Sequence, residues 1–140
     1  MAVYLKSLPG GGTLQQPLSA DESKMQQGQT IYYDQCAACH GGGGQGIVGL
    51  FPRLAGAPLV EQQQATSLIR VVLEGSRAIA TTGAPTGPAM PSFAWKLSND
   101  DIAAVITYIR HAWGNTAPGV QPIDVGSMRQ SLHREAERAP

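Results

Sequence analysis

Two cysteines and a histidine fall within five residues of this chain, and no other feature restricts its fold and chemistry as strongly. Cys36 and Cys39 are the only cysteines among the 140 residues, they stand three positions apart, and His40 follows at once. On a helical turn this separation brings both sulfur atoms to one side. Two thiols so placed can add across the two vinyl groups of one porphyrin, with the imidazole beneath the iron. The pentapeptide therefore predicts one covalently attached haem c.

Three other uses of a cysteine pair have to be weighed against haem attachment. A redox dithiol is expected within a βαβ pattern, and the sequence has none. A zinc site needs four ligands, and the remaining histidines, His111 and His133, lack ligand spacing. A structural disulfide between the two thiols stays open as a minor alternative.

Composition and charge narrow the class of protein. Ten basic and ten acidic residues cancel, so the total charge gives no support for nucleic-acid binding. Aromatic residues make up only 6% of the chain, and a bound apolar cofactor would supply the missing core volume. No apolar run approaches the ~20 residues of a membrane helix. Residues 1–4 lack the flanks of a signal peptide, which is compatible with a cytoplasmic protein, a mature form or a domain of a longer precursor.

The periodicity of apolar residues predicts an all-α fold with three main helices. The first begins at Ser19, where Ser19 and Glu22 fit a capping box, and runs into the cysteine pair. The second covers about 60–74 and the third about 99–113, each with apolar residues at helical spacing.

The segments between and after these helices lack such periodicity. Residues 76–93 contain prolines and glycines and are expected to form a long loop. Residues 117–140 are expected to form a tail with at most a weak helix over 125–137, and the charges of this tail are most simply explained as a solvated face.

An iron held by His40 has a second axial position, and Met90 is the candidate for it. Pro88 and Pro91 flank Met90 and restrict the loop, so that ordering it costs little entropy. Ligation by histidine and methionine raises the reduction potential and leaves no open coordination position, as an electron carrier requires. The alternative is a methionine that only fills a surface loop. The other methionines are less suitable by position, and they are Met1, Met25 and Met128.

At this point the chain resembles the class I c-type cytochromes over residues 19–116. In that family a glycine and a tyrosine of the first helix pack against the terminal helix, and Gly28 and Tyr32 match that pair. Their partner positions match Val105 and Tyr108. The resemblance implies the class I cytochrome c fold, with helices and loops wrapped around one covalent haem.

The resemblance extends to two loops. Phe51-Pro52-Arg53-Leu54 looks like the proximal loop of the family, which places Arg53 and Leu54 among the haem-contact candidates. The second ring nitrogen of His40 needs a hydrogen-bond acceptor, and the carbonyl of Pro52 is the candidate. The resemblance gives this assignment further support. Met90-Pro91-Ser92-Phe93 looks like the distal-ligand loop.

Three side chains are further candidates for cofactor contacts. Arg53 and Arg77 have the charge to pair with haem propionates, although each is equally well explained as a solvated surface charge. Trp95 carries an indole N–H that suits a propionate, and a plain core tryptophan is the alternative. Neither His111 nor Lys96 is expected in the site.

A closer resemblance is to the cytochrome subunits and domains of membrane-associated periplasmic dehydrogenases, of the quinoprotein alcohol or molybdenum hydroxylase type. Those proteins often carry three haem domains in tandem. Residues 1–18 then look like the stub of a preceding domain plus a linker, with Tyr4–Pro9 as the end of its last helix; residues 19–116 are the cytochrome domain and 117–140 the tail. Only one Cys-x-x-Cys-His is present here, so this chain alone cannot run a three-haem relay.

We therefore expect an electron carrier and not an enzyme. Its partners are expected to be a dehydrogenase subunit or an adjacent cytochrome domain on one side and a quinone, another cytochrome or an oxidase on the other. Class I attachment of haem takes place outside the cytoplasmic membrane, so the expected location is the periplasm. The alternatives are a haem enzyme or gas sensor with an open sixth position, and a docking module in which haem is only structural.

Overall fold

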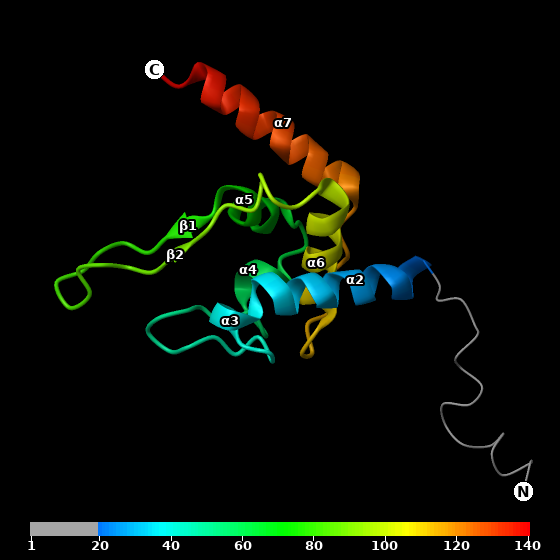
Figure 1. Cartoon of the computed structure of the whole chain (residues 1–140), viewed down its shortest axis with the longest axis horizontal. Coiled ribbons are helices and arrows are strands. Elements are labelled where there is room, and N and C mark those ends of the chain that lie inside the picture. The colour runs from blue at the N-terminus through cyan, green and yellow to red at the C-terminus, as the bar shows by residue number, and fades with distance from the viewer. Residues whose placement is uncertain (1–19) are drawn as a thin grey trace, which may run out of the picture.

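The computed structural model describes residues 20–140, and it is built mainly from helices. Figure 1 shows α2 crossing α6 at the centre, a hairpin of two short strands projecting to one side, and α7 leading away from the start of α6. The helices and strands, in chain order, are α2 (Ala20–Gln35), α3 (Ala37–His40), α4 (Pro58–Glu61), α5 (Thr66–Glu74), β1 (Ser76–Arg77), β2 (Ala89–Met90), α6 (Asn99–His111) and α7 (Pro122–Arg138). Within the described residues, no helix is long and apolar enough to span a membrane.

Helices α2 and α6 cross at a glycine. Gly28 is buried, and a Cβ atom at this position would collide with the backbone carbonyl of Ala104 and lie 2.8 Å from Cβ of Tyr108. Tyr32, one turn further along α2, is fully buried and packs on the ring of Tyr108, with 5.6 Å between the ring centroids. The expected packing of a Gly/Tyr pair against the terminal helix is confirmed.

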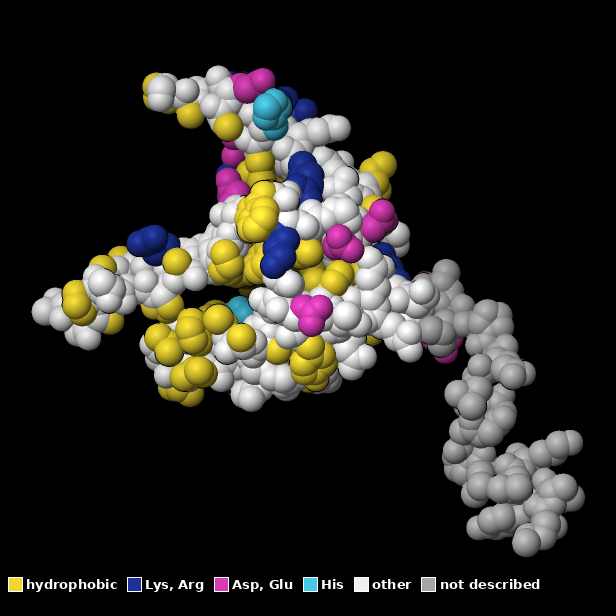
Figure 2. Space-filling view, viewed as in Figure 1, with side chains coloured by type: hydrophobic (Ala, Val, Ile, Leu, Met, Phe, Trp, Pro, Cys, Tyr) yellow, Lys and Arg dark blue, Asp and Glu magenta, His cyan; other side chains and the backbone are white. Residues whose placement is uncertain are grey.

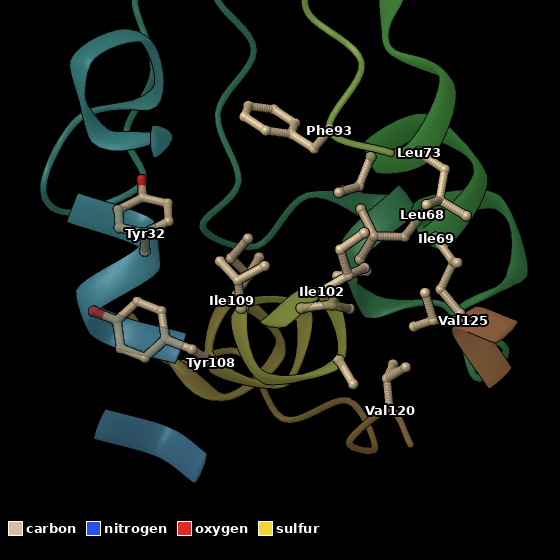
Figure 3. Close-up of a cluster of buried hydrophobic side chains, with 14 of the residues drawn as sticks. Tyr32, Leu68, Ile69, Leu73, Phe93, Ile102, Tyr108, Ile109, Val120 and Val125 are labelled. Atoms are coloured by element: carbon tan, nitrogen blue, oxygen red, sulfur yellow. The ribbon is translucent and has the colours of Figure 1, made fainter. Parts of the chain in front are cut away.

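Helix α6 is the centre of the core. Ser98 and Asp101 form a capping box at its start, with the Ser98 hydroxyl accepting from the amide of Asp101 at 3.1 Å. Residues 102–110 of α6 are all buried. Figure 3 shows how α6 side chains lie between the tyrosines and the apolar face of α5. That face is made of Leu68, Ile69, Val72 and Leu73.

The helix expected over about 60–74 is wrong in one respect, because the chain forms α4 and α5 with a break between them. One buried side chain is hydrogen-bonded to the backbone at this break. The guanidinium of Arg110, which is fully buried in α6, donates to the carbonyls of Val60, Gln62 and Gln63. These bonds satisfy the carbonyls that the break leaves without helical partners, and they hold the segment around the arginine.

The loop expected over 76–93 is partly ordered by backbone pairing. Strands β1 and β2 are antiparallel, with Ser76 opposite Met90 and Arg77 opposite Ala89. Two-residue strands are too short to produce an alternating pattern, which explains why the sequence did not reveal them. The all-α assignment needs this small addition and is otherwise confirmed.

The tail was predicted with at most a weak helix, and that prediction is wrong. Helix α7 covers 17 residues, and Val125 within it is completely buried. Met128 and Leu132 also pack against the core. The charges are not simply solvated either, because Arg129 bonds to the segment before α6 and Glu135 pairs with Arg70 of α5.

The prediction that Tyr4–Pro9 ends a preceding helix, and the capping box at Ser19, fall outside the described residues.

Candidate haem site

The cysteine pair lies at the end of α2, where the chain makes a tight turn. The amide of His40 donates to the carbonyl of Cys36 at 3.0 Å, so residues 36–40 form one helical turn, as the motif requires. Cys36 is partly buried, Cys39 is exposed, and His40 is only 8% exposed. Gly41 then reverses the chain with a φ of 82°, a conformation that glycine adopts without strain.

His40 is held by the loop that follows it. Its Nδ1 lies 2.8 Å from the carbonyl oxygen of Pro52, the contact that the sequence analysis expected. A carbonyl can only accept, so Nδ1 donates, and in the neutral ring Nε2 is then the nitrogen with the lone pair. A neutral imidazole fixed in this tautomer is the form that binds a metal.

The glycine-rich loop, residues 41–56, is folded tightly enough to hold Pro52 beside His40. The carbonyl of Gly44 accepts from the amides of Leu54 and Ala55 at 2.7 and 3.0 Å, and the amide of Gly46 donates to the carbonyl of His40 at 2.7 Å. At Gly46 φ is 63°, and a Cβ atom would lie 2.7 Å from the amide nitrogen of Arg53. The glycines therefore allow the close backbone contacts that bring the Pro52 carbonyl to the histidine.

A pocket of about 300 Å³ opens between this loop and the β1–β2 hairpin. Figure 2 shows the hollow at this position, with hydrophobic side chains on both of its sides. His40, in α3, lines the pocket, and Met90, at the end of β2, lines it from the hairpin. Both cysteines also line it. The remaining lining residues are mainly apolar and include Leu50, Phe51, Leu59, Val71, Pro91 and Phe93.

Burial affects the chemistry of the thiols. Burial, and to a smaller extent the neighbouring Cys39, raise the pKa of Cys36 to about 11. A redox dithiol needs a thiolate of lowered pKa, so the alternative of a thioredoxin-like pair loses support. Within residues 20–140, no three His, Cys, Asp or Glu side chains are grouped so that they could hold a metal ion, which removes the support for a zinc site.

Four of the predicted cofactor contacts do not line the pocket, namely Arg53, Leu54, Arg77 and Trp95. Arg53 donates to the carbonyl of Ala55 at 3.0 Å, and Arg77 is exposed in β1. Trp95 is 81% exposed, so the alternative of a core tryptophan is wrong. The propionate roles of Arg53, Arg77 and Trp95 stay predictions, as does a haem contact of Leu54.

Other side chains that support the site were not predicted in this role. Tyr32 donates to the carbonyl of Gly41 at 2.5 Å, and the indole of Trp113 donates to that of Gly42 at 3.2 Å. Asn115 is buried and accepts from the amide of Gly56 at 2.7 Å while donating to the carbonyl of Ile109 at 2.8 Å. These bonds tie both ends of the glycine-rich loop to α2 and α6.

The residues present fit a haem. The pocket combines apolar walls for a flat macrocycle, two thiols on one helical turn, and an imidazole whose Nδ1 is held by a hydrogen bond. Met90 of the hairpin also lines it. This is the donor set of a haem protein and not of a zinc or calcium site.

Comparisons with known proteins agree with this chemistry. Residues 25–113 match the family model of cytochrome c. The chain is 37% identical over 142 residues to the cytochrome c subunit of an alcohol dehydrogenase (quinone) from Gluconacetobacter polyoxogenes, covering 94% of this chain and 30% of that protein. It is 36% identical over 141 residues to a gluconate 2-dehydrogenase cytochrome c subunit from Pantoea cypripedii, covering 93% and 32%.

A smaller relative matches only the central part. Cytochrome c-552 of Thermus thermophilus is 42% identical over 87 residues, covering 59% of this chain and 66% of the relative. By contrast, the chain spans only about a third of the two dehydrogenase subunits. From the pocket, the Cys36–His40 turn and these matches together, the chain belongs to the cytochrome c family and carries covalently bound haem c.

Proposed function

We propose that this chain carries single electrons on a haem whose axial ligands are His40 and Met90. The observation that supports the proposal most strongly is the convergence of these side chains on one apolar pocket, with His40 already oriented by Pro52. When bound, the haem supplies a one-electron Fe(II)/Fe(III) couple. With both axial positions taken by the chain, no position is left for a substrate.

The chain's own residues have separable tasks in this proposal. Cys36 and Cys39 hold the porphyrin through thioethers. The apolar residues on both sides of the pocket exclude water, and since Cys39 is exposed, the edge it holds faces solvent. Electrons enter and leave at that edge. The hydrogen bond from His40 to Pro52 keeps the proximal ligand basic.

The proposed electron-transfer partners are inferred from what the relatives are. Two of them are cytochrome c subunits of an alcohol dehydrogenase (quinone) and of a gluconate 2-dehydrogenase. We infer that this chain accepts electrons from a dehydrogenase of that kind, or from a neighbouring haem domain, and passes them toward a quinone, another cytochrome or an oxidase. Because the matched subunits are about three times as long, we also infer that it is one haem domain of a multi-haem protein. Its location would be the periplasm.

The axial ligation is tested by the absorption of the oxidised holoprotein. Ligation by Met90 gives a near-infrared sulfur-to-iron charge-transfer band at neutral pH and slow binding of cyanide. Met90→Ala should remove the band and make cyanide bind rapidly. Met25→Ala is the control, because Met25 is also partly buried but does not line the pocket.

The rival is a haem enzyme or gas sensor with an open sixth position. An unmodified protein that lacks the band and binds cyanide at once would establish that rival and end the proposal of a His/Met carrier.

A further inference from the structure

The segment after Met90 is held by a helix that lies beyond the family match. The match ends at residue 113, and α7 begins at Pro122. One side chain of α7, Arg129, reaches the turn that links Met90 to α6. Its Nη1 donates to the carbonyl of Ala94 at 2.7 Å, its Nη2 to that of Leu97 at 2.5 Å, and its Nε to Oδ1 of Asn99 at 2.6 Å.

These bonds span the whole turn. Ala94 stands at its start, Leu97 near its end, and Asn99 is the first residue of α6. A planar guanidinium offers several donors in a fixed arrangement, so it fixes the spacing of three acceptors at once. Bonds to a charged donor are also stronger than neutral ones.

The turn is continuous with the pocket. Phe93 lines the pocket, and its carbonyl accepts from the amides of Lys96 and Leu97 at 3.1 and 3.0 Å. On the other side of the turn, Ser92 donates to the carbonyl of Leu73 at 2.5 Å and the amide of Phe93 donates to the carbonyl of Val72 at 3.1 Å. Residues 92–99 are therefore anchored to α5 at one end and to α7 at the other.

Helix α7 is itself placed closely enough to act as a support. Val125 is completely buried, and a Cβ atom on Gly126 would lie 3.2 Å from Nδ2 of Asn99. Gly126 and Arg129 are three positions apart and therefore share one face of the helix. Both meet α6 at Asn99.

We propose that Arg129 is a positioning residue for the distal ligand, holding the turn at residues 94–99 so that Met90 stays directed into the pocket. Arg129 does not line the pocket, so its role is to act through the turn. The inference rests on the proposed ligation by Met90. Without Arg129 the turn opens more often, and Met90 leaves the iron during each opening.

The test is the rate at which cyanide replaces Met90 in the oxidised holoprotein, measured at neutral pH under conditions where every variant is folded. Replacement requires the loop to open, so its rate reports on the turn and not on overall stability. Arg129→Ala should accelerate it about tenfold or more and weaken the near-infrared band. A lysine at this position can reach one acceptor but not three. The cyanide rate of Arg129→Lys should therefore lie between those of the unmodified protein and of Arg129→Ala.

Two controls separate this role from general docking of α7. Arg134 lies on the same helix and bonds only within it, to Ser131 at 3.3 Å, among the hydrogen bonds of the described residues. Arg70 pairs with Glu135 and joins α5 to α7 without contacting the turn. Arg134→Ala and Arg70→Ala should both leave the cyanide rate within about twofold of the unmodified protein, since exposed pairs contribute little.

The proposal is overturned if Arg129→Ala, or Arg129→Lys should the alanine variant not fold, binds cyanide no faster than Arg134→Ala. It is also overturned if Arg70→Ala accelerates binding equally. A different result, the absence of the near-infrared band from the unmodified protein, would instead refute the ligation by Met90.

Discussion

Gly28 illustrates how one residue can determine the packing of two helices. It is buried where α2 crosses α6, in contact distance of the Ala104 backbone and the Tyr108 side chain. The nearest atoms belong largely to backbone, so no change of rotamer can make room for a methyl group. A larger residue must therefore push the helices apart.

Gly28→Ala is expected to destabilise the protein by about 1–3 kcal/mol or more, as overpacking of a close contact does. The measurement is the free energy of unfolding of the holoprotein in urea. Gly83→Ala is the control, since its Cβ would meet nothing within 4 Å and its φ is not in the left-handed region. Equal stability of the two variants would show that α2 and α6 have room to adjust.

Some functional and structural residues could be identified from the sequence and others could not, for a physical reason. Cys36, Cys39 and His40 are adjacent, so their chemistry follows from local spacing. Arg110 was not singled out, because its acceptors are the carbonyls of residues 60, 62, 63 and 118. A partner some 50 residues away leaves no local signal, and an arginine in an amphipathic helix is usually solvated.

At the scale of elements, α6 shows which signals are dependable. Its start was correctly placed because the capping box is a local arrangement of two side chains and two amides. The break between α4 and α5 and the full length of α7 were missed. Both depend on tertiary contacts, with Arg110 in one case and with the core through Val125 in the other.

The capping box also makes stability depend on pH. Burial tends to raise the pKa of Asp101, but hydrogen bonds from Ser98 and from Gln27 outweigh it, and the pKa is lowered. A lowered folded-state pKa stabilises the protein above the unfolded value of about 4, and the contribution is lost as the pH falls through the folded value.

Asp101→Asn should therefore destabilise the protein most at neutral pH, by about 0.5–1 kcal/mol. The gap to the unmodified protein should shrink below about pH 4. Thermal unfolding across that range is the measurement, with the exposed neighbour Asp100→Asn as the control. A gap that does not change with pH would mean that the charge of Asp101 is not what stabilises the cap.

At the scale of the whole molecule, the pocket explains the composition. The apolar residues lining it come from the loop after α3, from α5 and from the β1–β2 hairpin, which are far apart in the sequence. Large apolar side chains of the same loop and hairpin remain exposed, among them Val48 and Ile79. A flat apolar cofactor between these walls serves as part of the core, which accounts for the low aromatic content.

The cytochrome c fold as a whole was predictable because its two defining motifs, the cysteine turn and the Gly28/Tyr32 pair, are short. The attachment of the hairpin and of α7 was not, since both are held by long-range contacts such as that of Arg129 with Leu97. The hairpin lies within the family match and lines the pocket, whereas α7 lies beyond the match, which ends at residue 113.

We propose a one-electron carrier with both axial positions filled by the chain's own residues. A potentiometric titration of the purified holoprotein, followed by its visible absorption, tests this proposal. We expect a single reversible one-electron transition that includes all of the haem, no binding of carbon monoxide by the reduced protein, and a lower potential in Met90→Ala. Rapid carbon monoxide binding by the unmodified reduced protein, or a potential unaffected by Met90→Ala, would contradict it.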